Sequence, residues 1–419
     1  MPAPLQDHPF RRAIMDEVHA RPVEIIDGPC RIRRVALMQP PVAGATARLM
    51  ARFEYFASTA GISAGTSRQR SFEAGTRLVT WEFHTEFITV TWRSGLDDKQ
   101  NWPNGIGLGI LDESQLIGAM RIDIIGDSAV PPRLLPGFAL PSLCVASLEA
   151  GTAQAVTDFV PDADGFTRFE FAAGGLSPLR RSIVARRLLE IETYRTMALL
   201  GLPLARELGP KLRACEIELT ALIETLSDAT TTDSVQTALS ALHNLSTRSG
   251  QLSEQLGYRF AAGHAYGDIL RTRLAGLREL PTALGSSLGS YVANRVDPGL
   301  ATCTAMEKRL VVLADKIERA IGLLNVRIGL DLQIQNKAVL ETIARTGTSQ
   351  FRLQRTVEGL STIAISYYLL GILSYLLAGP LEQFHFEKTM AMSLAAPAVL
   401  LVVWLMARAV RHQHAGHDA

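Results

Sequence analysis

GLSTIAISYYLLGILSYLLA, residues 359 to 378, and TMAMSLAAPAVLLVVWLMA, residues 389 to 407, contain no charged side chain. Each stretch has about twenty residues, the length that an α-helix needs to cross roughly 30 Å of hydrocarbon. A pair of buried core helices is the alternative, but uncharged runs of this length are rare in soluble folds. The two stretches therefore predict a C-terminal two-helix transmembrane hairpin over residues 358–408.

Charged residues around these stretches predict their orientation. Two arginines precede the first stretch and two follow the second, whereas the loop between them has two glutamates and one lysine: Arg352, Arg355, Arg408, Arg411, Glu382, Glu387 and Lys388. Positive charge is enriched on the cytoplasmic side of membrane proteins. We therefore expect a multi-pass protein of the bacterial inner membrane, with both termini in the cytoplasm, residues 409–419 as a cytoplasmic tail, and the 379–388 loop outside.

Small and hydroxyl-bearing side chains form two adjacent stripes on the first stretch: Ser361, Tyr367, Tyr368, Gly371, Ser374 and Tyr375. In lipid such stripes mark helix–helix packing, because small residues let backbones approach and hydroxyls bond across helices. A pore lining is the alternative. The second stretch has few polar residues and is expected to face lipid, so the predicted partners are the bilayer and further copies of the chain.

The composition of the whole chain limits which kinds of protein it can be. The chain has 419 residues, enough for about two or three domains. Its 42 basic and 41 acidic residues leave a net charge of +1, which gives no electrostatic footprint for nucleic acid. Cys30, Cys144, Cys215 and Cys303 lie far apart, as expected of reduced thiols in a cytosolic compartment. The N-terminus does not resemble a secretion signal.

Residues 1–176 are predicted to form an α+β cytosolic domain. Helices are expected within 7–22 and over 45–58, and a strand over 30–38. TAQAVTDFV and FTRFEFAA flank the turn PDADG and predict a β-hairpin. The glycine- and asparagine-rich stretch 94–116 and the segment near residue 130 are predicted as loops.

Residues 177–357 are predicted to form a helical, coiled-coil-like stalk without strands. Ser177 and Pro178 suit the cap and first position of a helix, and Pro203 and Pro210 are expected to interrupt or delimit helices. A long helix begins after Asp297, with apolar residues recurring every three or four positions: Met306, Leu310, Leu313, Ile317, Ile321, Leu324 and Ile328. This seam fits either a coiled coil that joins copies or an ordinary bundle helix.

The motif WEFHTEF, residues 81 to 87, is the candidate site. It lies in RLVTWEFHTEFITVTW, residues 77 to 92, which predicts either one long bulged strand or a tight hairpin. Alternate strand residues share a face, so Glu82, His84 and Glu86 are expected on one side. With Glu17 and His19 of EVHARP they could hold a divalent metal, the only cofactor indicated. Arg21, Arg31 or Arg33 could instead neutralise the acids in a structural ion-pair network, which we favour over a metal site or a solvated face.

Other motifs carry little chemistry. A Ser/His/Asp hydrolase is not indicated, and no histidine-based metalloprotease motif occurs. GIGLGILD lacks the lysine and spacing of a phosphate loop. His412, His414 and His417 in the tail could bind a metal weakly, but a frayed terminus is the simpler interpretation.

Three stretches taken together resemble a known family: HPFRRAIMDEVHARP, WEFHTEF and RLQRTVEGLSTIAISYYLLGILSYLL. They are similar to a bacterial, mostly proteobacterial, family of uncharacterised membrane-anchored proteins with a domain of unknown function. The resemblance extends over nearly the whole chain and implies membrane anchoring, without supplying catalytic residues. A looser likeness in architecture is to CorA-type magnesium transporters, but YLLAGPLEQF stands where those carry Gly-Met-Asn.

The sequence thus favours an oligomeric, membrane-anchored scaffold or regulator that faces the cytoplasm and is not an enzyme. A CorA-like cation channel and a membrane-tethered, metal-dependent enzyme are the two alternatives. A polar lining that converges on an axis would favour the channel, and a closed pocket around His84 would favour the enzyme.

Overall fold

The computed structural model describes residues 7–19, 22–63, 68–228, 232–383 and 388–415. Contacts within the chain group it into two compact units, Met1–Ile321 and Gly322–Ala419. The first unit holds the strands and most helices, and the second holds the end of one long helix and the C-terminal helix.

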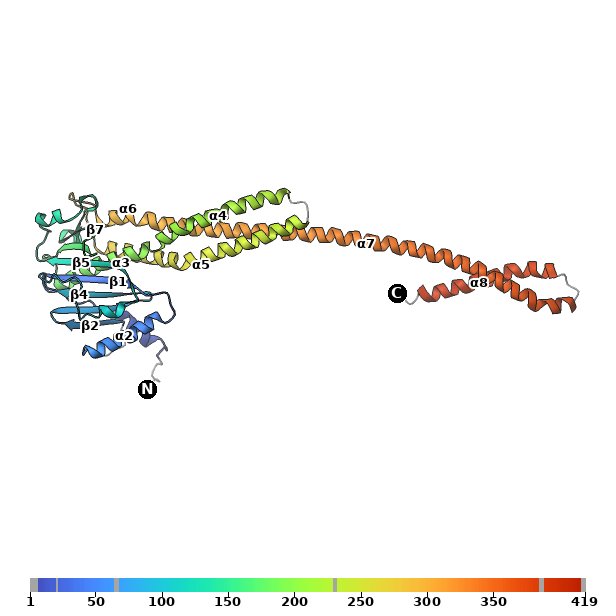
Figure 1. Cartoon of the computed structure of the whole chain (residues 1–419), viewed down its shortest axis with the longest axis horizontal. Helices are drawn as coiled ribbons and strands as arrows, with labels where there is room; N and C mark the ends of the chain where they lie inside the picture. The colour runs from blue at the N-terminus through green and yellow to red at the C-terminus, as the bar shows by residue number, and fades with distance from the viewer. Residues whose placement is uncertain (1–6, 20–21, 64–67, 229–231, 384–387, 416–419) are drawn as a thin grey trace, which may run out of the picture. The chain divides into compact units, whose positions relative to one another are not determined.

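One eight-stranded sheet forms the basis of the first unit, with the order β2-β3-β4-β1-β5-β8-β7-β6 (Figure 1). Neighbouring strands are antiparallel except for the parallel pair of β5 and β8. The strands are β1 (Cys30–Met38), β2 (Gln69–Ala74), β3 (Arg77–Phe83), β4 (Phe87–Ser94), β5 (Gln115–Ile125), β6 (Cys144–Leu148), β7 (Ala153–Pro161) and β8 (Thr167–Ala172).

Helices cover both faces of this sheet. On one face α2 (Ala45–Thr59) packs Phe53 against Trp81 and Phe83 of β3, with ring centroids 4.9 and 5.3 Å apart. On the other face α3 (Pro178–Leu199) buries Val184 and Leu188 in a core shared with β1, β5, β6, β7 and β8. The alternation of strand side chains therefore decides which helix each residue meets.

The segment from 77 to 92 is a hairpin. Phe83 of β3 pairs with Ile88 of β4, and the backbone N–H of His84 donates to the Phe87 carbonyl at 2.9 Å. Because four residues, 84 to 87, separate the paired Phe83 and Ile88, the buried apolar positions change from odd numbers in β3 to even numbers in β4. The parity change that also suggested a bulge thus comes from the turn.

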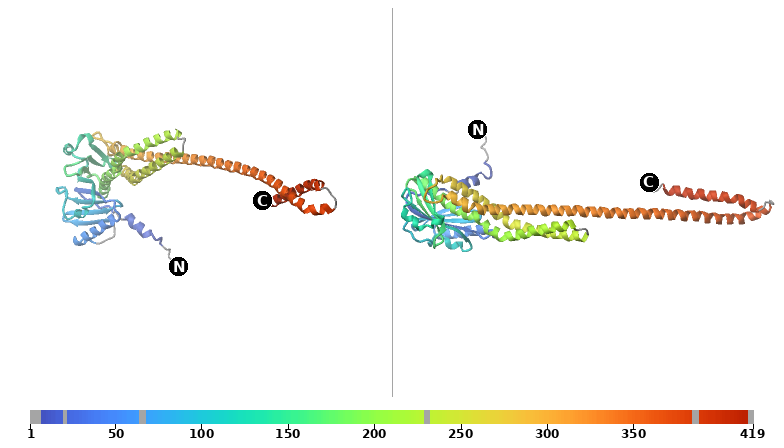
Figure 2. Two further views of the ribbon diagram at one scale, coloured as in Figure 1. Left: turned by 45° about the vertical axis from the view of Figure 1, so that its right-hand side comes forward. Right: turned by 90° about the horizontal axis from the view of Figure 1, so that it is seen from above.

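The helices after α3 form a bundle. Figure 2 shows α4 (Gly201–Asp228) and α5 (Thr232–Gly276) beside the first part of α7 (Asp297–Gln383). Arg309 of α7 pairs with Glu216 of α4 at 2.6 Å. In the predicted seam Met306, Leu310, Leu313 and Ile317 are buried within the chain, as in a bundle helix.

The β6 edge of the sheet is protected by later chain. Short bridges join Ser147 to Leu280 and Cys144 to Ser286, and α6 (Leu288–Arg295) packs next to them. An exposed strand edge is prone to pairing with other chains, so this segment closes one end of the sheet. The remaining helical elements are α1 (Arg11–His19) and the short turns η1 (Leu108–Leu111), η2 (Pro132–Gly137), η3 (Leu140–Ser142) and η4 (Glu149–Gly151).

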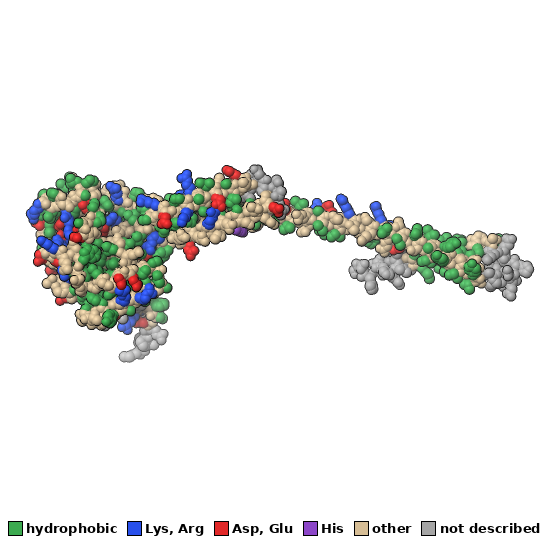
Figure 3. All heavy atoms as spheres, in the orientation of Figure 1, with side chains coloured by type: hydrophobic (Ala, Val, Ile, Leu, Met, Phe, Trp, Pro, Cys, Tyr) green, Lys and Arg blue, Asp and Glu red, His purple; other side chains and the backbone are tan. Residues whose placement is uncertain are grey.

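The second unit is formed by α7 from Gly322 onward and α8 (Lys388–Ala415). Leu324 and Ser366 of α7 and Val399 and Val403 of α8 are its buried side chains among those described. By length and composition the helical run Leu288–Leu376 can cross a membrane: its most apolar window has a mean hydropathy of 1.5 and is 6% buried. A shorter apolar helix spans Met392–Arg408. Figure 3 shows apolar side chains gathered at this end of α7.

The structure confirms several predicted elements and corrects others. Ser177 caps α3 by accepting a bond from the Arg180 amide, and β7 and β8 form the predicted hairpin. Pro210 was expected to interrupt or end a helix, but it lies inside α4. The predicted loop 94–116 runs into β5, a central strand that the sequence patterns did not indicate.

Candidate functional site

Glu82 lies at the centre of the candidate site and is buried between the sheet and α3. Its carboxylate accepts bonds from Arg34 of β1 at 3.1 Å and from the Thr89 hydroxyl of β4 at 3.0 Å. Arg186 of α3 approaches the other carboxylate oxygen at 3.4 Å. The contacts of Glu82 thus join three strands and one helix.

The electrostatic balance keeps Glu82 ionised. Burial alone raises the pKa of a carboxyl group, because removal from water disfavours the charge. Here the charges of Arg34, Arg186 and His84 and the Thr89 hydroxyl outweigh burial, so the pKa of Glu82 is lowered. A carboxylate held in this way resembles part of a structural network more than a proton donor or acceptor.

Glu86 points to a different set of partners, all on α5. Its carboxylate accepts bonds from Arg259 at 3.0 Å, from Tyr258 at 2.9 Å and from Tyr266 at 2.5 Å. Burial and then the bonded Glu86 carboxylate raise the pKa of Tyr266 well above its usual range. Glu86 therefore ties the β3–β4 turn to the helical bundle.

His84 lies between the two glutamates in sequence. Its ring stacks on Phe87, with centroids 4.1 Å apart and the planes 9° from parallel. It lines a pocket of about 70 Å³ together with Glu82, Arg186 and residues of α3 and α5. The predicted cluster of Glu82, His84 and Glu86 is thus divided between two ionic networks with His84 between them.

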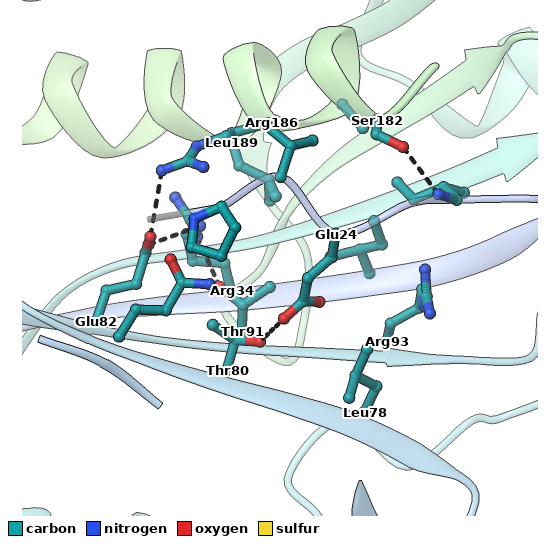
Figure 4. Close-up of a pocket in the computed structure, with 16 residues that line it drawn as sticks. Glu24, Arg34, Leu78, Thr80, Glu82, Thr91, Arg93, Ser182, Arg186 and Leu189 are labelled. Carbon is teal, nitrogen blue, oxygen red and sulfur yellow. Dashed lines mark hydrogen bonds and ion pairs between the residues drawn. The ribbon is translucent and has the colours of Figure 1, made fainter. Parts of the chain in front are cut away.

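A second pocket of about 70 Å³ lies on the other side of the Glu82 ion pairs (Figure 4). The segment 22–26 crosses the sheet here, and the Ser182 hydroxyl of α3 accepts a bond from the Ile26 amide at 2.8 Å. Glu24 accepts bonds from Ser71, at 2.7 Å, and from Thr80. The lining is mixed: charged ends of Arg34, Arg93 and Arg186 adjoin aliphatic side chains.

The structure does not describe the side chains with which the EVHARP motif was expected to complete the site. Arg21 is outside the described residues, and so are the side chains of Glu17 and His19, although α1 contains both positions. Within the described part of the chain no three His, Cys, Asp or Glu side chains are grouped so as to hold a metal ion. The metal interpretation, which needs Glu17 or His19, stays a prediction.

Two of the arginines expected to neutralise the acids lie on the opposite sheet face. Arg31 binds Asp123 through two bonds of 2.5 and 2.8 Å, and fully buried Arg33 donates to Asn101 at 2.8 Å. Arg34, one residue further along β1, faces Glu82 instead. The sequence RIRR signals a charged strand, but assigning the partners requires the register of three strands.

The face that carries Arg31 holds a second ionic network. It includes Asp98, whose pKa the Arg77 guanidinium holds well below the usual range, and Asp123. Glu170 of β8 is 6% exposed, and the Arg168 guanidinium lies 3.9 Å from its carboxylate. Burial and the Asp123 charge raise the pKa of Glu170 to about 7.

The predicted stripe on the first apolar stretch divides into exposed and partly covered residues. Tyr367, Tyr368 and Tyr375 are highly exposed, as is Ser361, whereas Gly371 and Ser374 are half-buried. Ser366, which the stripe omitted, is buried. Whether the stripe packs helices or lines a pore stays a prediction. The four cysteines are free and buried, as expected of reduced thiols.

A family model described as a protein of unknown function (DUF3422) matches residues 6–414, so the chain belongs to this family. This supports the resemblance to a family with a domain of unknown function. No curated protein and no solved structure matches the chain.

Replacing Glu82 with Gln should destabilise the protein by about 3 kcal/mol or more at pH 7, because Arg34 and Arg186 lose a buried counter-charge. The lowered pKa of Glu82 means that its stabilisation is present above the unfolded pKa of about 4.3 and is lost as pH falls through the lower folded value. The difference between wild type and Glu82→Gln in thermal unfolding should therefore shrink below about pH 4. Glu73→Gln, at an exposed site on β2, is the matched control, and an equal effect there would refute the role of Glu82.

Glu86→Gln and Tyr266→Phe should each weaken the link between the β3–β4 turn and α5. Bonds to a charged group contribute about 1.5–3 kcal/mol, and the loss in the double variant should be smaller than the sum of the single losses. Glu86→Gln should also lower the pKa of Tyr266, because the carboxylate raises it. Additive stability losses would show that the two side chains are not coupled.

Glu170→Gln should stabilise the protein at pH 8 and change little near pH 5. The folded pKa of Glu170 is about 7 and its unfolded value is about 4.3, so folding favours the protonated form. Wild-type stability should therefore fall as pH rises from the unfolded to the folded pKa, and the amide avoids this loss. Unfolding measured at both pH values tests this, and greater stability of wild type at pH 8 would contradict it.

Proposed function

We propose that this member of the DUF3422 family is a non-enzymatic, membrane-anchored scaffold or regulator whose sheet domain works in the cytoplasm. The observation that carries the proposal is the change in burial and composition along α7, a single helix from Asp297 to Gln383. Its first part is buried among α4 and α5, whereas its apolar window is 6% buried. An apolar surface of this size needs lipid or another protein to cover it.

The two-span hairpin is the arrangement that best fits the apolar segments. Met392–Arg408 is shorter than the first apolar window but matches the second predicted stretch, 389–407. Within the second unit α8 lies beside α7 (Figures 1 and 2), and Ser366 of α7 is buried. Hydroxyl side chains at helix interfaces are common in lipid. The arginines outside the spans support an orientation with both termini in the cytoplasm.

A scaffold or regulator is favoured over an enzyme by the ionic contacts of the site. Glu82 and Glu86 are both bound by arginines, and each contact joins the sheet to a helix. In a metal-dependent enzyme these carboxylates would have to release their arginine partners and bind a metal ion instead. The CorA-like channel and the metal-dependent enzyme remain the alternatives, the former tested by ion flux and the latter by bound metal in the purified chain.

Cysteine labelling in intact bacterial cells tests anchoring and orientation together. Gln383→Cys should react with an impermeant thiol reagent from outside, because it lies in the predicted external loop, 379–388. Thr348→Cys should react only after permeabilisation. The native cysteines are buried, so the wild-type chain provides the background.

The opposite labelling pattern would reverse the orientation. Recovery of the chain from the soluble fraction, with both cysteines unlabelled in intact cells, would overturn membrane anchoring itself.

A further inference from the structure

The part of α7 between its buried start and its apolar window has no cover within the described chain. The side chains from Gly329 to Val357 are exposed, apart from half-buried Gly347. A helix of this length is marginal in water unless an apolar face packs against something. The stretch therefore needs a partner along its length.

A seven-residue repeat runs through this exposed stretch. Apolar residues occupy most of the two inner positions: Leu332, Val339, Leu353 and Leu360 at d, and Ile343 and Val357 at a. These six side chains are 54–75% exposed. Gly329, Asn336, Thr346 and Gln350 occupy the other inner positions. Six of ten inner positions are thus large and apolar, which suits a two-helix seam.

The charged residues avoid that seam. Between residues 325 and 360 they all lie at the three outer positions b, c and f: Arg327, Asp331, Lys337, Glu341, Arg345, Arg352, Arg355 and Glu358. The flanking e and g positions carry Gln, Thr, Ser, Gly, Leu, Val and Ile. A surface meant for water alone would have no reason to keep one side free of charge. Ile334 and Phe351 lie at outer positions, and the seam does not account for them.

We infer that residues 329–360 of α7 form a parallel, in-register two-stranded coiled coil with a second copy of this chain. Three features select this partner over another. A repeat with β-branched residues at a, here Ile343 and Val357, and leucine at d favours two strands. Asn336 at an a position matches an identical Asn in a parallel pair and fixes register. The direction rests on the proposed anchoring, because copies in one membrane share their orientation.

The C-terminal helix leaves this seam accessible. Ser366, which is buried in the apolar part of α7, lies nine positions after Val357. At about 100° per residue that is half a turn around the helix. The side of α7 that is covered within the unit is therefore opposite the seam, so a second copy can reach it.

Disulfide cross-linking of the full-length chain in membranes tests the inference. Leu332→Cys and Leu353→Cys should both give covalent dimers on oxidation, because identical d positions meet in a parallel pair. Glu341→Cys and Thr348→Cys, at outer f positions, should give at least several-fold less. The wild-type chain, whose four cysteines are buried, is the background control.

A second pair of variants separates packing from misfolding. Ile343→Lys places a charge in the seam and should reduce cross-linking of both Leu332→Cys and Leu353→Cys several-fold. Glu341→Lys puts the same side chain on the outer face and should leave cross-linking unchanged. Equal effects of the two substitutions would overturn the seam.

The outcomes distinguish this inference from the proposed anchoring. A membrane-bound chain without seam-specific dimers, as expected if a different protein covers α7, refutes the homodimer alone. Cross-linking at only one of the two d positions refutes the parallel register. Seam-specific dimers of a chain found in the soluble fraction refute anchoring and leave the self-association intact.

Discussion

A carboxylate buried between a sheet and a helix must be matched by positive charge, and Glu82 imposes that requirement on the first unit. Its partners come from β1 and α3, two elements that also form the main core. Apolar packing between a sheet and a helix is non-directional, so many sliding arrangements bury similar area. The Glu82 contacts are compatible with few of these arrangements, because the guanidinium groups of Arg34 and Arg186 must each reach an oxygen of the Glu82 carboxylate.

Glutamates bound by arginines also occur in two turns next to strands. Glu86 binds Arg259 of α5, and Glu149 binds Arg180 of α3 at 2.7 Å. Arginine suits this task because its planar group stays charged and donates several bonds in fixed directions. The sheet and the bundle are thus joined by specific contacts as well as by their core.

The single helix α7 has three successive parts that differ in burial and in composition. Its first part is buried beside α4 and α5, its middle is exposed with charges on one side, and its last part is apolar. A continuous helix satisfies its backbone hydrogen bonds in protein, water and lipid alike. The side chains alone then decide what covers each part, and the proposed functions follow from that succession.

The sequence by itself determined the features that depend on local pattern. Two long stretches without charged residues indicated the apolar segments. Ser177 and Pro178 indicated the start of α3, and the turn PDADG indicated the β7–β8 hairpin. It also indicated that the acids of WEFHTEF need arginine partners. Only the tertiary structure assigned those partners to Arg34, Arg186 and Arg259, and only it revealed β5 as a central strand. The physical reason is that strand register and helix docking are long-range properties: a shift of one residue moves every side chain to the other face, and no local pattern records it.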